Sequence, residues 1–507
     1  MQGNIHERGL RQSLDWSLVL YYLLLVLIGW INIYASTQSA NPSSIFDFDF
    51  RAGKQFVWIL SGLGLAALIL FVIPPQIWQR VSLPIYGGVV LLLVAVIFLG
   101  SEVKGSHSWF QFGPVSFQPA EISKISTALL LSSFLAQPNL RLSAPKTLAA
   151  VAAIIILPML IILAERETGS ALVYVGFIFV LYRYGMSGWV LGFAGVTILL
   201  FIVTLTASPY TSLLILITLI SFINALGQKH FWKWFWILAG SVLVLSLLPW
   251  IHGLISDAVT AAQSRIDSTY TVTLPGKEPH VPFGFLKAVK PIYLLLAMSV
   301  CALPHFIINA FRSRDAAGYL SVAAFVAGMI LVFSTQFIFD KVLQPHQQRR
   351  IEVLLGMKED PSGVGYNVNQ SMIAIGSGGF TGKGFLQGTQ TSYGFVPEQS
   401  TDFIFCTVGE EWGFIGCFIV ILLYVLMIAR LIIDAERCRD PFTATYGYCV
   451  AACIFMHLFI NVGMTIGIMP VIGIPLPLLS YGGSSLWAFT VLIFIFIALY
   501  REEKKYY

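Results

Sequence analysis

An acidic residue stands where a polar segment gives way to an apolar one. Asp402 ends the polar run 388–402 and is followed directly by Phe403 and further apolar residues. A carboxylate at the boundary between water and lipid loses hydration, so we expect a raised pKa, which suits a general base near neutral pH. Asp402, with Ser400 and Thr401 before it, suits the start of a helix equally well, because Asp is a favoured N-cap residue. Both interpretations stay open at this point.

Glu121 and Lys124 form a second polar group, at the end of the stretch 117–124. Three residues separate them, so they share one face of a helix. Two charges inside a bilayer are tolerated mainly when they pair or line a water-filled cavity. Side chains near a helix end can also extend to the interface. Because the surrounding window is apolar, the sequence favours a cavity.

The segment 376–384 is rich in glycine and superficially suggests a phosphate-binding loop. The spacing of a Walker A loop fails, because Ser377 and Gly384 occupy positions that require a glycine and a hydroxyl residue. Backbone amides of such a turn could still bind a phosphate of a lipid headgroup. A flexible or tightly turned loop is the favoured interpretation.

Three further features carry charge or irregular backbone. The turn 165–167 holds Glu165, Arg166 and Glu167, and Glu410 and Glu411 lie inside an apolar run, as cavity lining or as a satisfied buried pair. The stretch 461–485 is rich in Gly and Pro. Irregular backbone at membrane depth must pack in protein or line water, although a simple helix kink would also explain these residues.

Histidines are scattered and predict no metal site. His107 and His346 lack the paired spacing of metal ligands, and no HExxH sequence or Ser-His-Asp arrangement is legible.

The elements that position these residues are membrane helices. Of 507 residues, 57% are hydrophobic and 11% are charged, which excludes a water-soluble fold. Apolar runs of about 17–22 residues recur, each long enough to cross a bilayer. The chain is therefore predicted to be an all-α polytopic membrane protein. A net charge of +5, with Lys and Arg spread between helices, gives no support for nucleic-acid binding. Arg8 and Arg11 before the first long span indicate an uncleaved signal anchor.

Apolar windows predict fourteen spans, seven before residue 208 and seven after it. They cover residues 16–36, 55–73, 82–100, 120–136, 147–164, 168–184, 187–207, 209–226, 234–251, 291–311, 318–339, 403–429, 445–468 and 484–500.

The basic residues predict the orientation of these spans. With a cytoplasmic N-terminus, sixteen Lys and Arg fall in inner connections, whereas the short outer loops hold only Arg51, Lys54, Lys104 and Arg166. This bias places both termini in the cytoplasm. Two long segments, 251–290 and 340–402, then lie outside, and we expect function in the second of them.

Several of these stretches together resemble the SEDS family (shape, elongation, division and sporulation) of peptidoglycan glycosyltransferases. Among its members, the Gly-Thr-Gln sequence from Gly388 and the stretch ending at Arg350-Ile resemble the elongation type more than the division type. The matching segments are 117–124, 168–171, 375–384, 388–391, 397–403, 409–411 and 473–484.

The resemblance implies a reaction and a site. Asp402 falls on the essential aspartate of the family, proposed to deprotonate the 4-hydroxyl of an acceptor GlcNAc. That oxygen attacks the anomeric carbon of a lipid II donor, and undecaprenyl pyrophosphate leaves. Glu121 and Lys124 fall on a cavity pair that supports the substrate site. Further implied substrate contacts are Gln118, Thr389, Gln390, Glu398, Arg349 and Ser480. The family is described as needing a divalent cation, Mg or Mn, but its ligands are unknown here.

The resemblance also implies partners and a location. They are lipid II, a class B penicillin-binding protein with transpeptidase activity, elongation-complex proteins and membrane lipid, in the bacterial cytoplasmic (inner) membrane. A lipid II flippase or transporter would also have a membrane cavity with kinked helices. A non-catalytic scaffold of the elongation complex is the second rival.

The chain departs from the family pattern at several places. Residues 105–109 lack the usual Arg before Trp109, Glu167 replaces an Asp, and Ser400 replaces a common His. Typical members also lack about 110 residues near 208–317. The predicted domains are therefore 1–207, an insertion 208–317, and 318–507 with the catalytic loop 340–402.

Overall fold

The computed structural model is helical and forms two compact units. It describes residues 14–37, 44–103, 106–112, 115–142, 144–226, 231–273, 316–343, 345–355, 357 and 364–504, with a few residues between 292 and 307. Unit 1 comprises Met1–Ser187 with Arg350–Tyr507, and unit 2 comprises Gly188–Arg349. The boundary thus falls inside helix α16 (Pro345–Leu354). The three domains predicted from the sequence remain a prediction.

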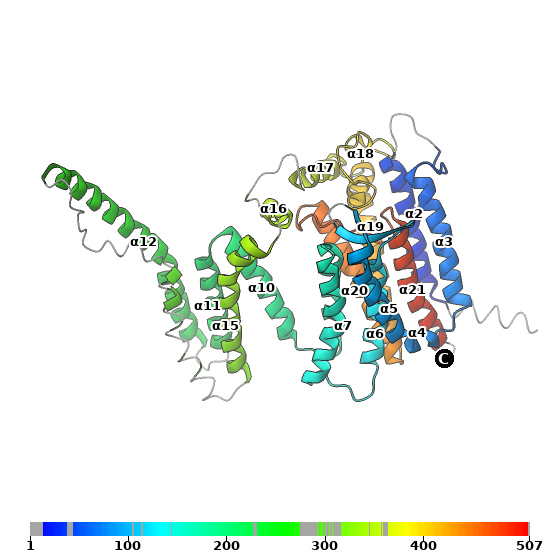
Figure 1. The fold of residues 1–507 in the computed structure, drawn as a ribbon, viewed down its shortest axis with the longest axis horizontal. Helices are drawn as coiled ribbons and strands as arrows, with labels where there is room; N and C mark the ends of the chain where they lie inside the picture. The colour runs from blue at the N-terminus through cyan, green and yellow to red at the C-terminus, as the bar shows by residue number, and fades with distance from the viewer. Residues whose placement is uncertain are drawn as a thin grey trace, which may run out of the picture. The chain divides into compact units, whose positions relative to one another are not determined.

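The long helices of unit 1 lie side by side (Figure 1). They are α2 (Trp16–Thr37), α3 (Arg51–Phe71), α5 (Ser82–Leu99), α6 (Pro119–Leu135), α7 (Pro145–Ala164), α19 (Ile404–Arg437), α20 (Pro441–Thr465) and α21 (Gly483–Lys504). Shorter elements are α4 (Gln76–Arg80), α8 (Thr168–Val173), the 3₁₀ turn η1 (Tyr174–Gly176), α9 (Phe177–Arg183), α17 (Val364–Ser377) and α18 (Thr389–Ser392). Helices α17 and α18 lie at the end of the bundle where α19 begins.

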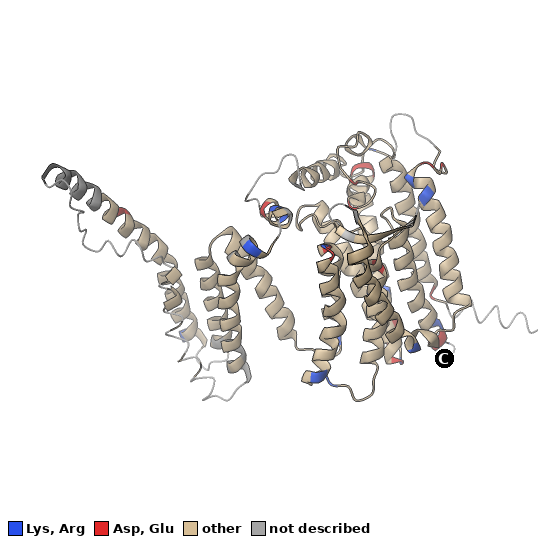
Figure 2. Ribbon diagram, viewed as in Figure 1, with Lys and Arg blue, Asp and Glu red and all other residues tan. Residues whose placement is uncertain are grey.

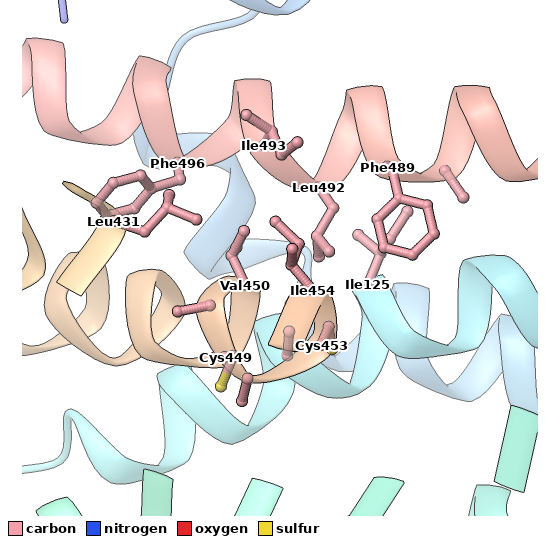
Figure 3. Close-up of a cluster of buried hydrophobic side chains, with 14 of the residues drawn as sticks. Ile125, Leu431, Cys449, Val450, Cys453, Ile454, Phe489, Leu492, Ile493 and Phe496 are labelled. Carbon is pink, nitrogen blue, oxygen red and sulfur yellow. The ribbon is translucent and has the colours of Figure 1, made fainter. Parts of the chain in front are cut away.

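Helices α20 and α21 form the centre of unit 1, because they are apolar on every face. Their apolar windows are 78% buried, against 22% for α5. Side chains from α6, α19, α20 and α21 meet in one core, which includes Leu431, Val450, Leu492 and Phe496 (Figure 3). Charged residues lie mainly at the two ends of these helices (Figure 2).

A small antiparallel sheet precedes α6 and was not predicted. Strands β1 (Ser101–Val103), β2 (Ser106–Phe112) and β3 (Val115–Phe117) pair in sequence order. Phe110 pairs with Phe117. The sheet therefore fixes the backbone directly before Gln118 and the first turn of α6.

Unit 2 consists of α10 (Gly188–Thr206), α11 (Pro209–Leu226), α12 (Phe231–Thr273), α15 (Ala316–Phe337) and the π-helical turn η2 (Ile338–Val342). Leu200, Leu213, Leu216 and Phe325 form its apolar core. The first part of the segment 251–290, which the sequence places outside the membrane, is helical, because α12 continues as one helix to Thr273. Its placement outside remains a prediction. Pro249 lies inside α12 without ending it.

The predicted helical membrane fold is confirmed, but the count of fourteen spans is not. Among the described residues, nine helices are long and apolar enough to cross a membrane, and three shorter apolar helices accompany them. The expected span 120–136 corresponds to helix α6, which carries Glu121 and Lys124 and is not among these helices. Most of the expected span 291–311 lies outside the described residues.

Candidate active site

Asp402 lies on the turn that leads into α19. It is half-buried, and the N-cap of α19 is Phe403. The alternative interpretation of Asp402 as the cap of this helix is therefore not what the structure shows. Its Oδ2 atom lies 3.3 Å from the position that a Cβ atom would take on Gly473. Gly473 has a positive φ of 76°, so glycine allows both this backbone conformation and the close approach of the carboxylate.

Asn461 of α20 holds the backbone of this turn from behind. Its Nδ2 atom donates to the carbonyl oxygen of Asp402 at 2.9 Å and to that of Ile474 at 2.7 Å. Ile474 belongs to the irregular segment 466–482 between α20 and α21. One buried amide thus joins the Asp402 turn to the Gly- and Pro-rich stretch that the sequence singled out.

Ser480 and Glu398, both predicted to contact substrate, stabilise the same turn. Ser480 Oγ donates to the carbonyl oxygen of Thr401 at 2.5 Å. The carbonyl oxygen of Glu398 accepts from the backbone N–H groups of Thr401 and Phe403, at 3.1 and 3.2 Å. Their contact with substrate remains a prediction.

Ser400 receives contacts from two other elements. Its hydroxyl accepts a hydrogen bond of 2.5 Å from Arg51, and its carbonyl oxygen accepts one of 2.8 Å from the backbone N–H of Tyr481. The Arg51 guanidinium lies over the Tyr481 ring, 5.6 Å from its centre. The Ser400 hydroxyl is therefore bound to an arginine.

Arg350 is the basic residue that interacts with Asp402. Burial lowers the pKa of Arg350, and the negative charge of Asp402 opposes that effect. The guanidinium in turn favours the ionised form of the carboxylate. The sequence named the preceding residue, Arg349, which is exposed and belongs to unit 2, so its contact with substrate remains a prediction.

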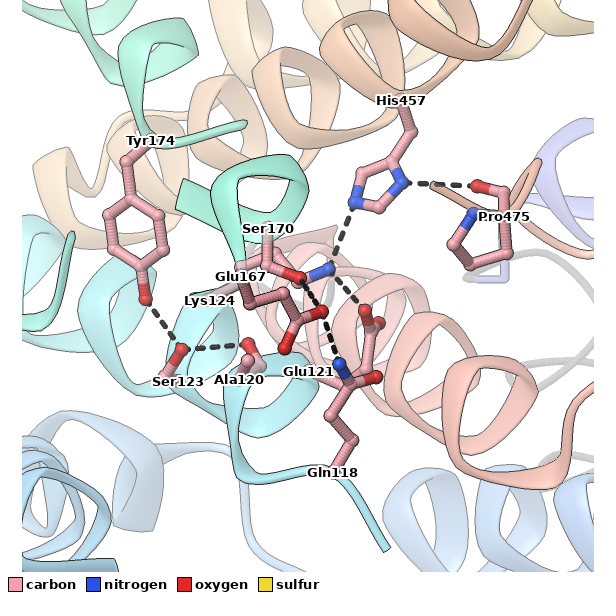
Figure 4. Close-up of polar contacts among 10 residues, drawn as sticks. All are labelled: Gln118, Ala120, Glu121, Ser123, Lys124, Glu167, Ser170, Tyr174, His457 and Pro475. Atoms are coloured by element: carbon pink, nitrogen blue, oxygen red, sulfur yellow. Dashed lines mark hydrogen bonds and ion pairs between the residues drawn. The ribbon is translucent and has the colours of Figure 1, made fainter. Parts of the chain in front are cut away.

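Glu121 and Lys124 form a buried ion pair on α6, as their spacing predicts. Each side chain is 2% exposed, and Lys124 Nζ lies 2.8 Å from Glu121 Oε1. Lys124 also binds His457 Nε2 at 2.9 Å (Figure 4). Its Nζ atom lies 5.3 Å from the centre of the Phe489 ring. Ile125, Ala488, Phe489 and Leu492 pack around the pair and leave no room for a water molecule there, so the structure shows a paired, buried site at this point rather than the expected cavity.

Gln118 connects this pair to the turn that follows α7. Its amide donates to Glu167 Oε1, which also accepts from Ser170 Oγ at 2.8 Å (Figure 4). Burial raises the pKa of Glu167, hydrogen bonds from Ser170 and Ser108 oppose this, and the charge of Glu121 raises it further. Gln118, Glu121 and Glu167 therefore belong to one electrostatic cluster.

The glycine-rich segment 376–384 packs against a break in α19. Gly413 interrupts the helix with a φ of 65°. The backbone N–H groups of Lys383 and Gly384 donate to the carbonyl oxygens of Glu410 and Glu411, both at 3.0 Å. The tight-turn interpretation is correct, because these amides bind the carbonyl groups that the break leaves without helical partners.

Thr389 and Gln390, also predicted to contact substrate, begin the short helix α18. The fully buried carboxylate of Glu410 accepts from the backbone N–H groups of Gln390 and Thr391, at 2.8 and 2.9 Å. Lys383 Nζ bridges Glu410 Oε1 and Thr389 Oγ1, both at 2.7 Å. Glu410 is thus a satisfied buried acid that holds the start of α18, and the substrate contacts of Thr389 and Gln390 remain predictions.

A ligand set for the expected divalent cation is not seen. In the part of the chain that the structure describes, no group of three His, Cys, Asp or Glu side chains could hold a metal ion.

Sequence reasoning missed His457, Asn461, Arg350 and Lys383. The signal for the first two was present, because they are polar residues one helical turn apart in an otherwise apolar span. Arg350 and Lys383 lie in the segment 340–402 with other basic residues. Only the folded structure shows that these two approach Asp402 and Glu410.

The sequence and the fold both match known proteins. The family model described as cell cycle protein (FtsW, RodA, SpoVE) matches residues 15–247 and 315–505. The peptidoglycan glycosyltransferase RodA of Treponema pallidum is 30% identical over 478 residues, 93% of this chain and 94% of that protein. The peptidoglycan glycosyltransferase MrdB of Escherichia coli is 27% identical, over 93% and 90%.

One solved structure has the same fold. A chain from a structure describing the coordination of polymerization and crosslinking by a peptidoglycan synthase complex superposes with a TM-score of 0.55. It is 23% identical, and the match covers 97% of this chain and 98% of that one. The chain therefore belongs to the FtsW/RodA/SpoVE family, as its resemblance to the SEDS glycosyltransferases predicts.

Proposed function

We propose that this peptidoglycan glycosyltransferase polymerises lipid II at the outer face of the bacterial cytoplasmic membrane, with Asp402 as the general base. The observation that supports this role most directly is the placement of Asp402. Its carboxylate is half-buried beside Gly473 and Arg350, and its backbone is held by Asn461. A general base has to be ionised and held at a defined position, and these contacts favour both conditions.

In the proposed reaction, Asp402 takes the proton of the acceptor GlcNAc 4-hydroxyl while that oxygen attacks the anomeric carbon of the donor. The bond between this carbon and the pyrophosphate oxygen breaks, and undecaprenyl pyrophosphate leaves with the electron pair. Arg350 favours ionised Asp402 before the transfer. Because the leaving group is an anion, nearby guanidinium groups such as that of Arg51 would lower its energy.

The cluster of Gln118, Glu121 and Lys124 supports this site from inside the bundle. We place the remaining substrate contacts on the outer side, at Thr389, Gln390, Glu398, Arg349 and Ser480. Each of them can be tested by its effect on the KM for lipid II.

The decisive experiment compares wild-type protein, Asp402→Asn and Asp49→Asn with purified lipid II. Asp49 is an exposed outer aspartate and serves as the matched control. We expect glycan polymer from wild type and Asp49→Asn, and none from Asp402→Asn. Polymer from a well-folded Asp402→Asn protein would contradict the assignment of the base.

Two rivals give different results. A flippase moves lipid II between leaflets of vesicles, makes no polymer and tolerates Asp402→Asn. A scaffold supports normal cell shape without catalysis, so cells carrying only Asp402→Asn would grow as rods with normal glycan synthesis.

We also propose that both termini face the cytoplasm and that the protein works with a class B penicillin-binding protein in the elongation complex. The excess of basic residues in the inner connections supports the orientation. Labelling of single cysteines by a membrane-impermeant reagent tests it, with labelling expected at position 49 and not at position 502. Co-purification with the transpeptidase expressed in the same cells tests the partner.

A further inference from the structure

His457 is fully buried and contacts two different parts of the molecule. Its Nε2 atom lies 2.9 Å from Lys124 Nζ, and its Nδ1 atom lies 3.2 Å from the carbonyl oxygen of Pro475 (Figure 4). The ring also packs edge-on against Phe489, with 4.9 Å between the ring centres. The imidazole therefore bridges the ion pair on α6 and the irregular segment between α20 and α21.

The two partners determine which nitrogen carries the proton. A carbonyl oxygen can only accept, so Nδ1 must carry hydrogen and donate to Pro475. Lys124 is an ammonium group, because it binds the Glu121 carboxylate at 2.8 Å, and an ammonium group can only donate. Nε2 therefore accepts, and the geometry assigns His457 as the neutral imidazole with its proton on Nδ1.

Pro475 belongs to the segment that holds the proposed base. Its neighbour Ile474 shares the Asn461 amide with the carbonyl oxygen of Asp402, and Gly473 adjoins the Asp402 carboxylate. Asn461 lies one helical turn after His457 on α20, so the two side chains fix successive residues of this segment. A shift at Pro475 would therefore be transmitted to the surroundings of Asp402.

We infer that His457 is a positioning residue for Asp402, acting through its hydrogen bond to Pro475. This inference rests on the proposed function, in which Asp402 is the general base. His457 does not touch substrate in this role. It holds the segment 473–475 at a fixed position against α20. The ion pair of Glu121 and Lys124 keeps the imidazole of His457 oriented.

Two substitutions separate the two hydrogen bonds of His457. The amide of asparagine reaches the place of Nδ1, whereas that of glutamine reaches the place of Nε2. His457→Asn therefore keeps a donor for Pro475 and loses the partner of Lys124. His457→Gln keeps an acceptor for Lys124 and loses the bond to Pro475. Both variants remove one buried hydrogen bond, so each serves as the stability control of the other.

We expect His457→Gln to lower the kcat of polymerisation about tenfold, because the segment beside Asp402 is no longer held in place, with the KM for lipid II unchanged. We expect His457→Asn to retain most of the wild-type kcat. Rates are compared on monodisperse protein, and melting temperatures are recorded for both variants. Equal kcat values for the two variants, or a larger loss in His457→Asn, would overturn the inference, because a purely structural role would not distinguish the two bonds in this order.

Asp402→Asn is assayed beside the two histidine variants, so that failure of the proposed function can be distinguished from failure of the role of His457. If Asp402→Asn makes polymer, the proposed function fails whatever the histidine variants do. If Asp402→Asn is inactive while the two histidine variants have equal kcat, only the role of His457 fails. If neither histidine variant folds, ¹⁵N-histidine spectra of wild-type protein in bilayers give the test. A neutral imidazole protonated on Nδ1 supports the inference, and its absence overturns it.

Discussion

The side chain of Asn461 binds the backbone of Asp402, not its carboxylate. Its Nδ2 atom donates to the Asp402 carbonyl oxygen at 2.9 Å and to the Ile474 carbonyl oxygen at 2.7 Å. The position of the proposed base is thus set by an amide on a helix in the centre of the bundle. The carboxylate itself lies beside Gly473 and interacts electrostatically with Arg350.

This relationship predicts the effect of removing the amide. Asn461→Asp has the same shape but no N–H groups: the ionised acid donates to neither carbonyl oxygen and the neutral acid to only one, and each unsatisfied buried group costs about 1–3 kcal/mol. We expect both a lower melting temperature and a loss of kcat of at least tenfold. Asn32→Ala is the matched control, because Asn32 is a buried amide that donates within its own helix, to the Ile28 carbonyl oxygen. It should lower stability but leave the kcat of the folded protein unchanged. A normal kcat in Asn461→Asp would contradict the role of this amide.

The packing of the glycine-rich loop against the break in α19 predicts unequal effects of two similar substitutions. Gly379 and Gly382 both have positive φ, 57° and 82°, so alanine at either position costs about 1–2 kcal/mol in backbone strain. A Cβ atom on Gly382 would lie 2.1 Å from the carbonyl oxygen of Glu411, whereas a Cβ atom on Gly379 meets nothing within 4 Å. Gly382→Ala should therefore lower the melting temperature much more than Gly379→Ala. Equal melting temperatures for the two variants would show that the loop does not pack closely against α19.

Helix α18 depends on Glu410, and this dependence predicts its response to protease. Glu410→Gln places an amide group against the N–H groups of Gln390 and Thr391 and removes the partner of Lys383. Loss of one member of a buried ion pair costs about 3–5 kcal/mol where both partners are buried. Lys383 is 26% exposed, so water can solvate its charge when the partner is removed. The substitution therefore mainly destabilises α18. We expect limited proteolysis near residues 388–394 to be faster in Glu410→Gln than in wild type. Lys383→Gln, which leaves both backbone hydrogen bonds to Glu410 in place, should be cleaved at a rate between the two.

The sequence predicts the helices of this fold well because its apolar runs are long. The expected spans 16–36 and 484–500 differ from α2 and α21 by only a few residues. Prediction fails where length and hydropathy carry no information. The sheet 101–117 consists of short strands that pair only with one another, and α12 continues past Ile251 because Pro249 is tolerated inside it.

The types of residue that form the site could be predicted from the sequence, but the contacts that these residues make with one another mostly could not. The spacing of Glu121 and Lys124 on one helix reveals their pairing, because that contact is local. The contact of Lys124 with His457 joins residues 333 positions apart, and the contact of Asn461 with Asp402 joins residues 59 apart. Contacts between residues so far apart in the sequence depend on the packing of α20 against α6 and α19. A local sequence pattern does not predict this packing.

Glu165 gives the clearest dependence of stability on pH. Its side chain is 1% exposed, and among the described residues neither carboxyl oxygen has a hydrogen-bond partner. Burial, and secondarily the charge of Glu167, raise the pKa of Glu165 from 4.5 to about 8. Between these two values the folded protein binds a proton that the unfolded chain releases. The free energy of unfolding therefore falls as the pH rises from 4.5 to 8, and the contribution is fully present only below 4.5.

Glu165→Gln removes this titration while keeping the shape of the neutral acid. The variant and wild type should have similar melting temperatures in detergent at pH 5, and the variant should be the more stable at pH 8.5. Glu167, whose pKa is also raised, contributes with the same sign in both proteins, so the comparison at each pH isolates Glu165. Asp49→Asn, which changes an exposed carboxyl group, should follow wild type at every pH. A difference between Glu165→Gln and wild type that stays constant from pH 5 to 8.5 would mean that Glu165 is ionised in the folded protein. It would then need a cationic partner that the described residues do not supply.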